Sequence, residues 1–95
     1  MNLIEPILAN AAAITKVRRD IHAHPELCFE EVRTADLVAA RLTEWDIPIH
    51  RGLGTTGVVG IVHGRDGGKA ATERGRAIGL RADIDALPMT EFNTF

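Results

Sequence analysis

The feature that most constrains the fold is a change of hydrophobic period near the middle of the chain. Up to about residue 45, apolar residues recur at three- and four-residue steps, which is the period of an amphipathic helix. After Pro48, apolar residues come in short, β-branched runs between glycines, which is typical of strands. The sequence therefore predicts an α/β fold, with two N-terminal helices followed by strands of a central sheet.

The first helix is predicted over about residues 3–21. Its apolar residues form one stripe, and its charged and amide side chains mostly occupy the other side. Pro25 is expected to end this helix, because the residue before a proline is disfavoured in the helical conformation. We therefore expect His24 to be extended.

The second helix is predicted over about residues 30–45 and is stopped by Pro48. Glu30 and Glu31 suit its first turn, where the helix dipole favours negative charge. Trp45 closes the apolar stripe, so we expect it to lie in the core rather than on a recognition surface.

Three strands are predicted in the second half of the chain, over residues 47–51, 58–63 and 77–85. Residues 64–76 are polar, rich in glycine and without a hydrophobic period, so we expect a mobile hairpin connection there. In the last strand, a period of two places the apolar residues on one face and the charged residues on the other.

Residues 52–57 match the G-x-G-x-x-G spacing of dinucleotide-binding loops. Those loops work only where a helix begins at the glycines, so that its N-terminus meets the pyrophosphate. Residues 58–62 instead form a good strand and a poor helix start. The sequence therefore favours a tight glycine turn over a nucleotide site.

Asp83 and Asp85 form the strongest candidate site. On a strand both carboxylates would share one face at the C-terminal end, where ligands bind in open α/β sheets. Two converging carboxylates can coordinate or orient a hard cation. The simpler interpretation, which the spacing alone favours, is that Arg81 pairs with Asp83 at the surface and contributes less than about 1 kcal/mol.

His22, His24 and Cys28 are weaker candidates. The two histidines straddle a helix end, so we expect them to cap or hydrogen-bond that end rather than bind metal. Cys28 is expected to be a small thiol packed beside Leu27 and Phe29, since no base that would activate it is identifiable.

Charge and composition argue against several classes of partner. The net charge is −2 with both signs interspersed, and one tryptophan, three phenylalanines and no tyrosine leave little for base stacking, so no nucleic acid is expected. No apolar run is long enough to span a membrane, and the N-terminus lacks the pattern of a signal peptide. The single cysteine favours a reducing compartment, so we expect a cytoplasmic protein.

Several motifs occur in order along the chain. They are His22-Ala23-His24-Pro25-Glu26-Leu27, Phe29-Glu30-Glu31, Thr34, Gly54-Thr55-Thr56-Gly57-Val58-Val59-Gly60 and Ile78-Gly79-Leu80-Arg81-Ala82-Asp83-Ile84-Asp85-Ala86-Leu87-Pro88. Together they resemble the N-terminal part of the metallo-amidohydrolase family that contains hippurate hydrolase, aminoacylase and indole-acetyl-amino-acid hydrolase. The resemblance covers roughly residues 15–92. Each motif alone is weak, whereas the ordered set is specific.

The resemblance implies that residues 1–95 are the incomplete N-terminal part of a single catalytic α/β domain of the zinc-peptidase type, without the smaller lid and dimerisation domain. The parent enzyme would hydrolyse the amide bond of small-molecule N-acyl amino acids of the hippurate type, as a homo-oligomer. In that family two divalent metal ions activate a bridging water and a glutamate is the general base. The residues do not select among Zn, Mn, Co and Ni.

The resemblance also assigns roles to the two aspartates. Asp85 matches the aspartate of a His-x-Asp motif that orients the metal site, so we expect it to be catalytic. Asp83 occupies the position of the histidine that binds metal in that motif, so it is a weaker candidate for a metal ligand. The main ligands are expected beyond Phe95, in a Cys-Gly-His-Asp segment, a Glu-Glu pair and further histidines, so the chain alone should be inactive. The alternative is a stand-alone, non-catalytic α/β module derived from such an enzyme.

Overall fold

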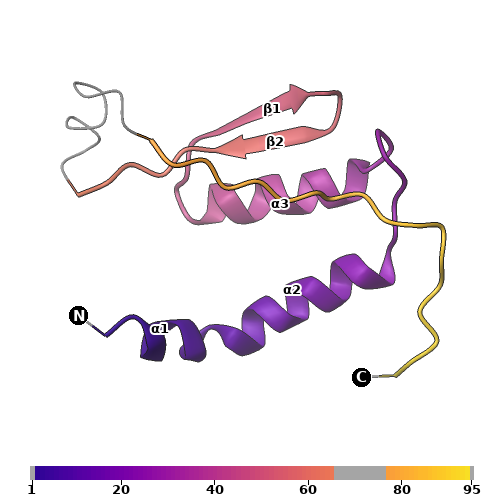
Figure 1. Ribbon diagram of the computed structural model, residues 1–95, viewed down its shortest axis with the longest axis horizontal. Coiled ribbons are helices and arrows are strands. Elements are labelled where there is room, and N and C mark those ends of the chain that lie inside the picture. The colour runs from indigo at the N-terminus through magenta and orange to yellow at the C-terminus, as the bar shows by residue number, and fades with distance from the viewer. Residues whose placement is uncertain (1, 66–76, 95) are drawn as a thin grey trace.

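The computed structural model describes residues 2–65 and 77–94 of the chain. Within them, three helices precede a two-stranded sheet: α1 (Ile4–Ala9), α2 (Ala11–Ala23), α3 (Val32–Glu44), β1 (Ile49–Leu53) and β2 (Gly57–Gly60). In Figure 1, α3 lies between the β1–β2 hairpin and α2. The expected α/β order, with helices before strands, is confirmed.

The helix predicted over residues 3–21 is in fact two helices, α1 and α2, which meet at Asn10. The Asn10 side-chain amide donates a hydrogen bond of 2.8 Å to the carbonyl of Pro6. Side-chain bonds of this local kind compete with the regular helix ladder, and for that reason asparagine favours helix ends. At the other end, α2 stops before His24, which has φ −127°, so the prediction that Pro25 ends the helix is confirmed.

α3 agrees with the predicted second helix to within two residues at each end, and Glu31 occupies its N-cap position. At the C-terminus, Asp46 adopts a left-handed φ of 56°. Its N–H donates to the carbonyl of Thr43, and the N–H of Ile47 donates to the carbonyl of Leu42, each at 3.0 Å. This pair of bonds is the Schellman motif, which satisfies carbonyl groups that a helix end would otherwise leave without a donor.

The turn between β1 and β2 depends on glycine. Gly52 and Gly54 have φ of 90° and 56°, a region that side chains rarely adopt. A Cβ on Gly57 would lie 2.3 Å from the carbonyl oxygen of Leu53, the residue with which Gly57 pairs. Since a strand begins at Gly57, the prediction that the glycines of residues 52–57 serve a turn is confirmed.

The hairpin packs against α3. Its antiparallel register aligns Ile49 with Gly60, and a Cβ on Gly60 would lie 3.2 Å from Leu42 of α3. Across the same interface, the Arg51 guanidinium of β1 is 2.6 Å from the Asp36 carboxylate of α3. Gly60 therefore lets the sheet approach the helix closely.

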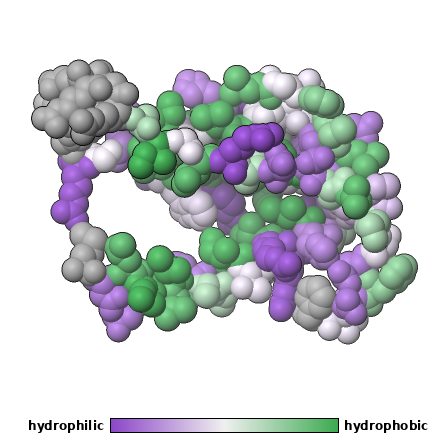
Figure 2. Space-filling view, viewed as in Figure 1, coloured by the Kyte–Doolittle hydropathy of each residue, from purple (hydrophilic) through white to green (hydrophobic). Residues whose placement is uncertain are grey.

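The buried core of the described residues is small. Ala35 and Ala39 of α3 are its buried apolar side chains, and Glu31 and Thr34 are buried beside them. The Cα radius of gyration is 16.0 Å, whereas a compact domain of this length would have about 12–13 Å. Figure 2 shows hydrophobic surface over α1 at the lower left, where Leu3, Ile4, Ile7 and Leu8 are exposed.

The predictions that Trp45 and Cys28 are buried are both wrong. Trp45 is 55% exposed, because within the described residues it lines a space between α2 and α3 and nothing covers its outer face. Cys28 is exposed and belongs to the loop between α2 and α3, whose next residue, Phe29, has a left-handed φ of 64° and is also exposed. A loop that turns outward in this way offers the thiol no packed neighbours.

The strand predicted over residues 77–85 is not present. Residues 77–94 form no regular element and do not join a sheet, and the described sheet has the order β1–β2. A strand requires a neighbour whose N–H and C=O groups complete the ladder, and none is aligned with this segment in the described part of the chain. Ile78 and Leu80 are consequently 92% and 96% exposed. The predicted hairpin connection at residues 64–76 lies outside the described residues, except for its first two.

No helix in the described ranges, 2–65 and 77–94, is long and apolar enough to cross a membrane.

Candidate functional site

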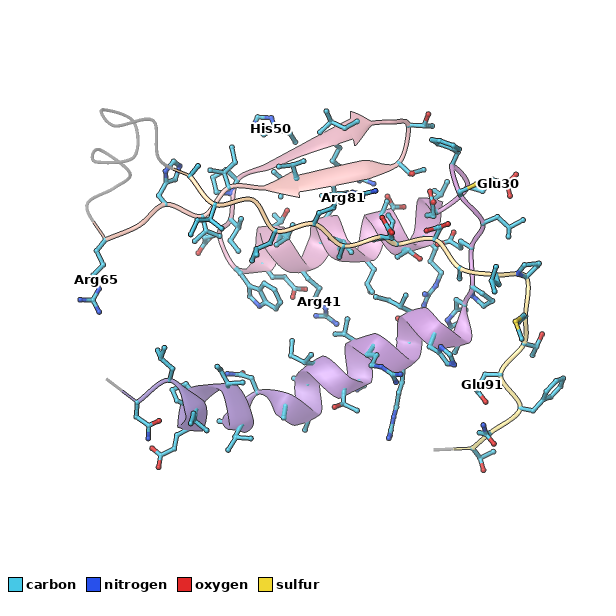
Figure 3. The ribbon with its side chains drawn as sticks, viewed as in Figure 1. Glu30, Arg41, His50, Arg65, Arg81 and Glu91 are labelled. Carbon is cyan, nitrogen blue, oxygen red and sulfur yellow. The ribbon has the colours of Figure 1, made fainter. Side chains whose placement is uncertain are left out.

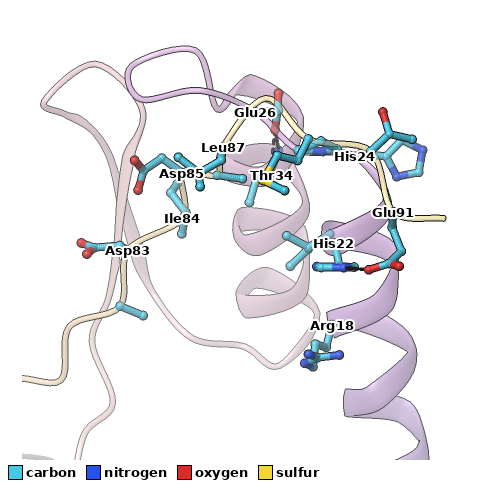
Figure 4. Close-up of a pocket in the computed structure, with 16 residues that line it drawn as sticks. Arg18, His22, His24, Glu26, Thr34, Asp83, Ile84, Asp85, Leu87 and Glu91 are labelled. Atoms are coloured by element: carbon cyan, nitrogen blue, oxygen red, sulfur yellow. Dashed lines mark hydrogen bonds and ion pairs between the residues drawn. The ribbon is translucent and has the colours of Figure 1, made fainter. Parts of the chain in front are cut away.

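A pocket of about 620 Å³ lies between the C-terminal half of α2, the loop that follows it and residues 82–91 (Figure 4). It brings together most of the polar residues that the sequence singled out. The titratable side chains that line it are Arg18, His22, His24, Glu26, Asp83, Asp85 and Glu91. Segments far apart in the sequence therefore meet at one place, which makes this pocket the candidate functional site.

Asp83 and Asp85 point to the same side of their segment, on the opposite side from the His22–Glu91 pair (Figure 4). The predicted alternation of side chains holds even though no sheet forms there. Asp83 forms a 2.9 Å ion pair with Arg81, and both side chains are largely exposed, as in the simpler interpretation of the sequence. Asp85 has no hydrogen-bond or ion-pair partner among residues 2–65 and 77–94. Of the two carboxylates, Asp85 is thus the one available to a ligand.

The two histidines at the end of α2 make different contacts. Nε2 of His22 lies 2.6 Å from Oε2 of Glu91, so α2 is joined to the extended segment. Nδ1 of His24 donates to the carbonyl of Asp20 at 2.8 Å, one turn back in the same helix. The prediction that these histidines cap or hydrogen-bond the helix end is confirmed for His24, whereas His22 bonds the distant Glu91 instead. The bond from His22 is the main reason that the pKa of Glu91 lies below its ordinary value.

Glu26 is a residue of the site that sequence reasoning missed. Its Oε1 accepts hydrogen bonds from the main-chain N–H of Thr34 at 2.6 Å and from the Thr34 hydroxyl at 2.5 Å, while Oε2 accepts from the N–H of Arg33 at 3.0 Å. Burial raises the pKa of Glu26, but these bonds outweigh that effect, so the pKa lies below its ordinary value. Glu26 therefore caps the first turn of α3 from six residues before that helix begins.

Glu31, at the N-cap position of α3, makes the corresponding contact to the hairpin. Its Oε2 accepts a 2.5 Å hydrogen bond from the hydroxyl of Thr56 in the β1–β2 turn. That bond is the largest cause of a lowered pKa at Glu31. Two glutamates thus hold opposite sides of one helix start, Glu26 facing the pocket and Glu31 facing the hairpin. For Glu31, the signal in the sequence was its expected place at the helix start, whereas no local pattern marks the contact of Glu26 with Thr34.

The described residues do not complete a metal site. Within residues 2–65 and 77–94, no three side chains of His, Cys, Asp or Glu are grouped so that they could hold a metal ion. Divalent metals in catalytic sites take about three protein ligands. Asp83 and Asp85 therefore fit a metal only if further ligands come from elsewhere.

A second pocket, of about 700 Å³, lies between α2 and α3. It is lined by Asn10, Ala13, Ile14, Lys16, Val17, Asp20, Leu37, Arg41 and Trp45. Arg41 lies between the two helices (Figure 3) and bonds Glu44 at 3.0 Å. The single carboxylate that lines this second pocket is that of Asp20, which forms a 2.9 Å ion pair with Arg33. This space therefore lacks the converging carboxylates of the first pocket.

The proteins to which this chain is similar include three whose names state a hydrolytic activity. Hippurate hydrolase of Campylobacter jejuni subsp. jejuni serotype O:2 is 44% identical over 91 residues, which are 96% of this chain and 22% of the relative. N-acetylcysteine deacetylase of Bacillus subtilis is 40% identical over 83 residues, covering 82% and 19% respectively. IAA-amino acid hydrolase ILR1-like 5 of Arabidopsis thaliana is 39% identical over 75 residues, covering 79% and 15%.

The chain spans about a fifth of the length of these relatives. No family model matches it, and no solved structure matches it. The aligned 91 residues of the hippurate hydrolase nevertheless amount to almost the whole of this chain, so the similarity extends over both α3 and the segment with Asp83 and Asp85.

Proposed function

Since this chain belongs to the amidohydrolase family that includes hippurate hydrolase, N-acetylcysteine deacetylase and the IAA-amino acid hydrolases, we propose that the whole protein hydrolyses the amide bond of N-acyl amino acids. The observation that carries the proposal is the identity of 35–44% to relatives whose names state hydrolysis of N-acyl compounds or of amides. The pocket supports it, because the segment with the two aspartates lines a concave, largely apolar site into which several titratable residues are brought together.

We propose Asp85 as the residue of this segment that acts in the reaction. Asp85 belongs to the segment that lines the pocket, and its carboxylate has no partner within the described residues, whereas Asp83 is paired with Arg81. A carboxylate free of protein partners stays available to orient a group that binds later. Asp85 would hold and orient the reacting groups, and Asp83 would contribute mainly to the local charge.

Metal dependence is a further part of the proposal. The whole protein would use a pair of divalent metal ions, with most ligands supplied by residues other than those described. When bound, such ions lower the pKa of a coordinated water and polarise the acyl carbonyl. Since no group of three candidate ligands occurs in residues 2–65 and 77–94, the 95-residue chain alone is expected to be inactive.

The test compares the complete gene product that carries these residues with the 95-residue chain. Each is assayed for release of free amino acid from N-benzoylglycine, N-acetylcysteine and an indole-acetyl amino acid. The assays are run with added Mn²⁺, Co²⁺, Zn²⁺ or Ni²⁺ and with a chelator. We expect turnover by the complete product, its loss with chelator and none by the short chain.

Absence of hydrolysis of all three substrates by the metal-loaded complete product would overturn the proposed activity. Turnover that survives exhaustive chelation would overturn only the metal dependence. Turnover by the 95-residue chain would show instead that this chain already carries the full catalytic set.

A further inference from the structure

Glu26 is the residue at which the helix start and the candidate site are joined. Both oxygens of its carboxylate are engaged by the first turn of α3, through Arg33 and Thr34. Thr34 is 1% exposed and its two bonds to Glu26 are partly buried, whereas the bond from the N–H of Arg33 is exposed. Hydrogen bonds to a charged acceptor in such a setting are stronger than neutral ones. The loop is therefore fixed to α3 at this point.

The main chain of the same residue holds the segment with the aspartates. The carbonyl of Glu26 accepts a 2.7 Å hydrogen bond from the N–H of Ala86, the residue directly after Asp85. Within the part of the chain that the structure describes, this is the hydrogen bond that joins residues 77–86 to the helical body. Consecutive Cα atoms are about 3.8 Å apart, so fixing Ala86 also limits where Asp85 can lie.

We propose that Glu26 is a positioning residue for Asp85. The Glu26 carboxylate holds the loop after α2 against the start of α3. The Glu26 carbonyl, through its bond to Ala86, then fixes the distance between residues 82–86 and that loop. The half-buried side chain of Ile84 points to the side opposite the two aspartates (Figure 4). Its burial therefore helps to keep the aspartates turned outward. This inference rests on the proposed function only where catalysis is the readout.

Glu31 offers a matched control within the same helix start. It is also a glutamate, it also accepts a hydrogen bond from a threonine hydroxyl, and it is 5% exposed. Its partner, Thr56, belongs to the β1–β2 turn rather than to the pocket. Either substitution would remove a side-chain hydrogen bond at the start of α3, whereas displacement of Asp85 should follow only from a change at Glu26.

The experiment uses the complete gene product and the variants Glu26→Ala, Glu26→Gln and Glu31→Gln. The first readout is hydrogen exchange of the peptide that contains the Ala86 amide. The second is kcat and KM for N-benzoylglycine. For Glu26→Ala we expect exchange at Ala86 about 10-fold faster and kcat about 100-fold lower, with a smaller change in KM, because a displacement near 1 Å has costs of that size.

Glu26→Gln keeps one amide oxygen as an acceptor, so it should lie between wild type and Glu26→Ala in both readouts. If Glu26→Ala does not fold, Glu26→Gln alone decides. Glu31→Gln should speed exchange in the β1–β2 turn but leave the Ala86 amide and kcat close to wild type.

Unchanged exchange at Ala86 in both Glu26 variants would overturn the proposal, as would equal effects of the Glu26 and Glu31 variants on kcat. If the wild-type protein hydrolyses no N-acyl amino acid, the proposed function fails. The exchange readout then still decides whether Glu26 holds the Asp85 segment.

Discussion

The structure contains two regions that are held in different ways. The first, residues 26–61, comprises α3 and the hairpin. Its helix is capped by the Glu26 carboxylate at the start and by the Schellman motif around Asp46 at the end, and Glu31 bonds the helix start to the β1–β2 turn. The second, residues 77–94, has no regular element and leaves Leu80 and Phe92 96% and 90% exposed.

The contrast shows where local interactions suffice and where they do not. α3 and the hairpin satisfy their main-chain polar groups with partners inside residues 26–61, so their structure depends little on contacts with the rest of the chain. The 77–94 segment depends on distant partners: Ala86 bonds Glu26, and Glu91 bonds His22 across 69 positions. The candidate functional carboxylates are in the region with fewer attachments, as is common for reactive groups on irregular segments.

The largest expected effect is a loss of catalytic activity on substitution of a carboxylate in the second region. In the complete gene product, Asp85→Asn should lower kcat/KM for N-acyl amino acids by at least about 100-fold, because it removes the charge but keeps the shape. Its thermal unfolding midpoint should stay close to wild type, since Asp85 has no partner among the described residues. Asp83→Asn is the control. A larger loss of activity from Asp83→Asn than from Asp85→Asn would reverse the assignment.

The next effect separates the two regions by stability. Gly57→Ala should destabilise the protein by about 1–3 kcal/mol, because the new methyl group would meet the carbonyl of Leu53. Gly79→Ala makes the same change in the second region, where nothing lies within 4 Å, and should be nearly neutral. Thermal unfolding of both variants measures the difference. Equal midpoints would show that the two regions are constrained alike.

A smaller effect probes the cap of α3. Thr34→Val keeps the volume but removes the hydroxyl that bonds Glu26, and should cost about 1–2 kcal/mol. Thr43→Val in the same helix removes a hydroxyl bond to the neutral carbonyl of Ala39, and should cost less because that acceptor carries no charge. Thermal unfolding of the two variants gives the comparison. A larger cost at Thr43 would mean that the Glu26 cap contributes little.

The smallest effect is a dependence on pH. The pKa values of Glu26 and Glu31 in the folded state lie below the ordinary value of 4.5. The stability that these carboxylates add is therefore fully present above about pH 4.5 and is lost as the pH falls through the lower, folded-state pKa. In acid unfolding experiments, a Glu26→Gln, Glu31→Gln double variant should lose less stability than wild type between about pH 5 and 3. Parallel curves would exclude this contribution.

The elements whose ends are set by neighbouring residues were predicted well. Pro25 marked the end of α2, and the glycines of residues 52–57 marked the turn, because proline and glycine act on the backbone directly. The strand predicted over residues 77–85 was wrong, since a period of two describes side chains and does not supply a partner strand. The break at Asn10 was missed because a helical stripe continues across it.

For the candidate site, the sequence predicted which residues lie at the pocket better than how they are held. The spacing of Asp83 and Asp85 was enough to place both carboxylates on one side. The contacts of Glu26 with Thr34 and Ala86 could not be read from any period, because they join a loop, a helix start and an extended segment. Such contacts depend on the tertiary arrangement, which a local pattern does not encode.

The exposed position of Trp45 has a spectroscopic consequence. This residue is the single tryptophan of the 95 residues, which contain no tyrosine. It lines the space between α2 and α3 while 55% of it faces solvent. The near-ultraviolet absorbance and emission of the chain therefore arise almost wholly at that junction. A shift of the emission maximum to shorter wavelength would show that another surface packs against α2 and α3 and shields Trp45 from water.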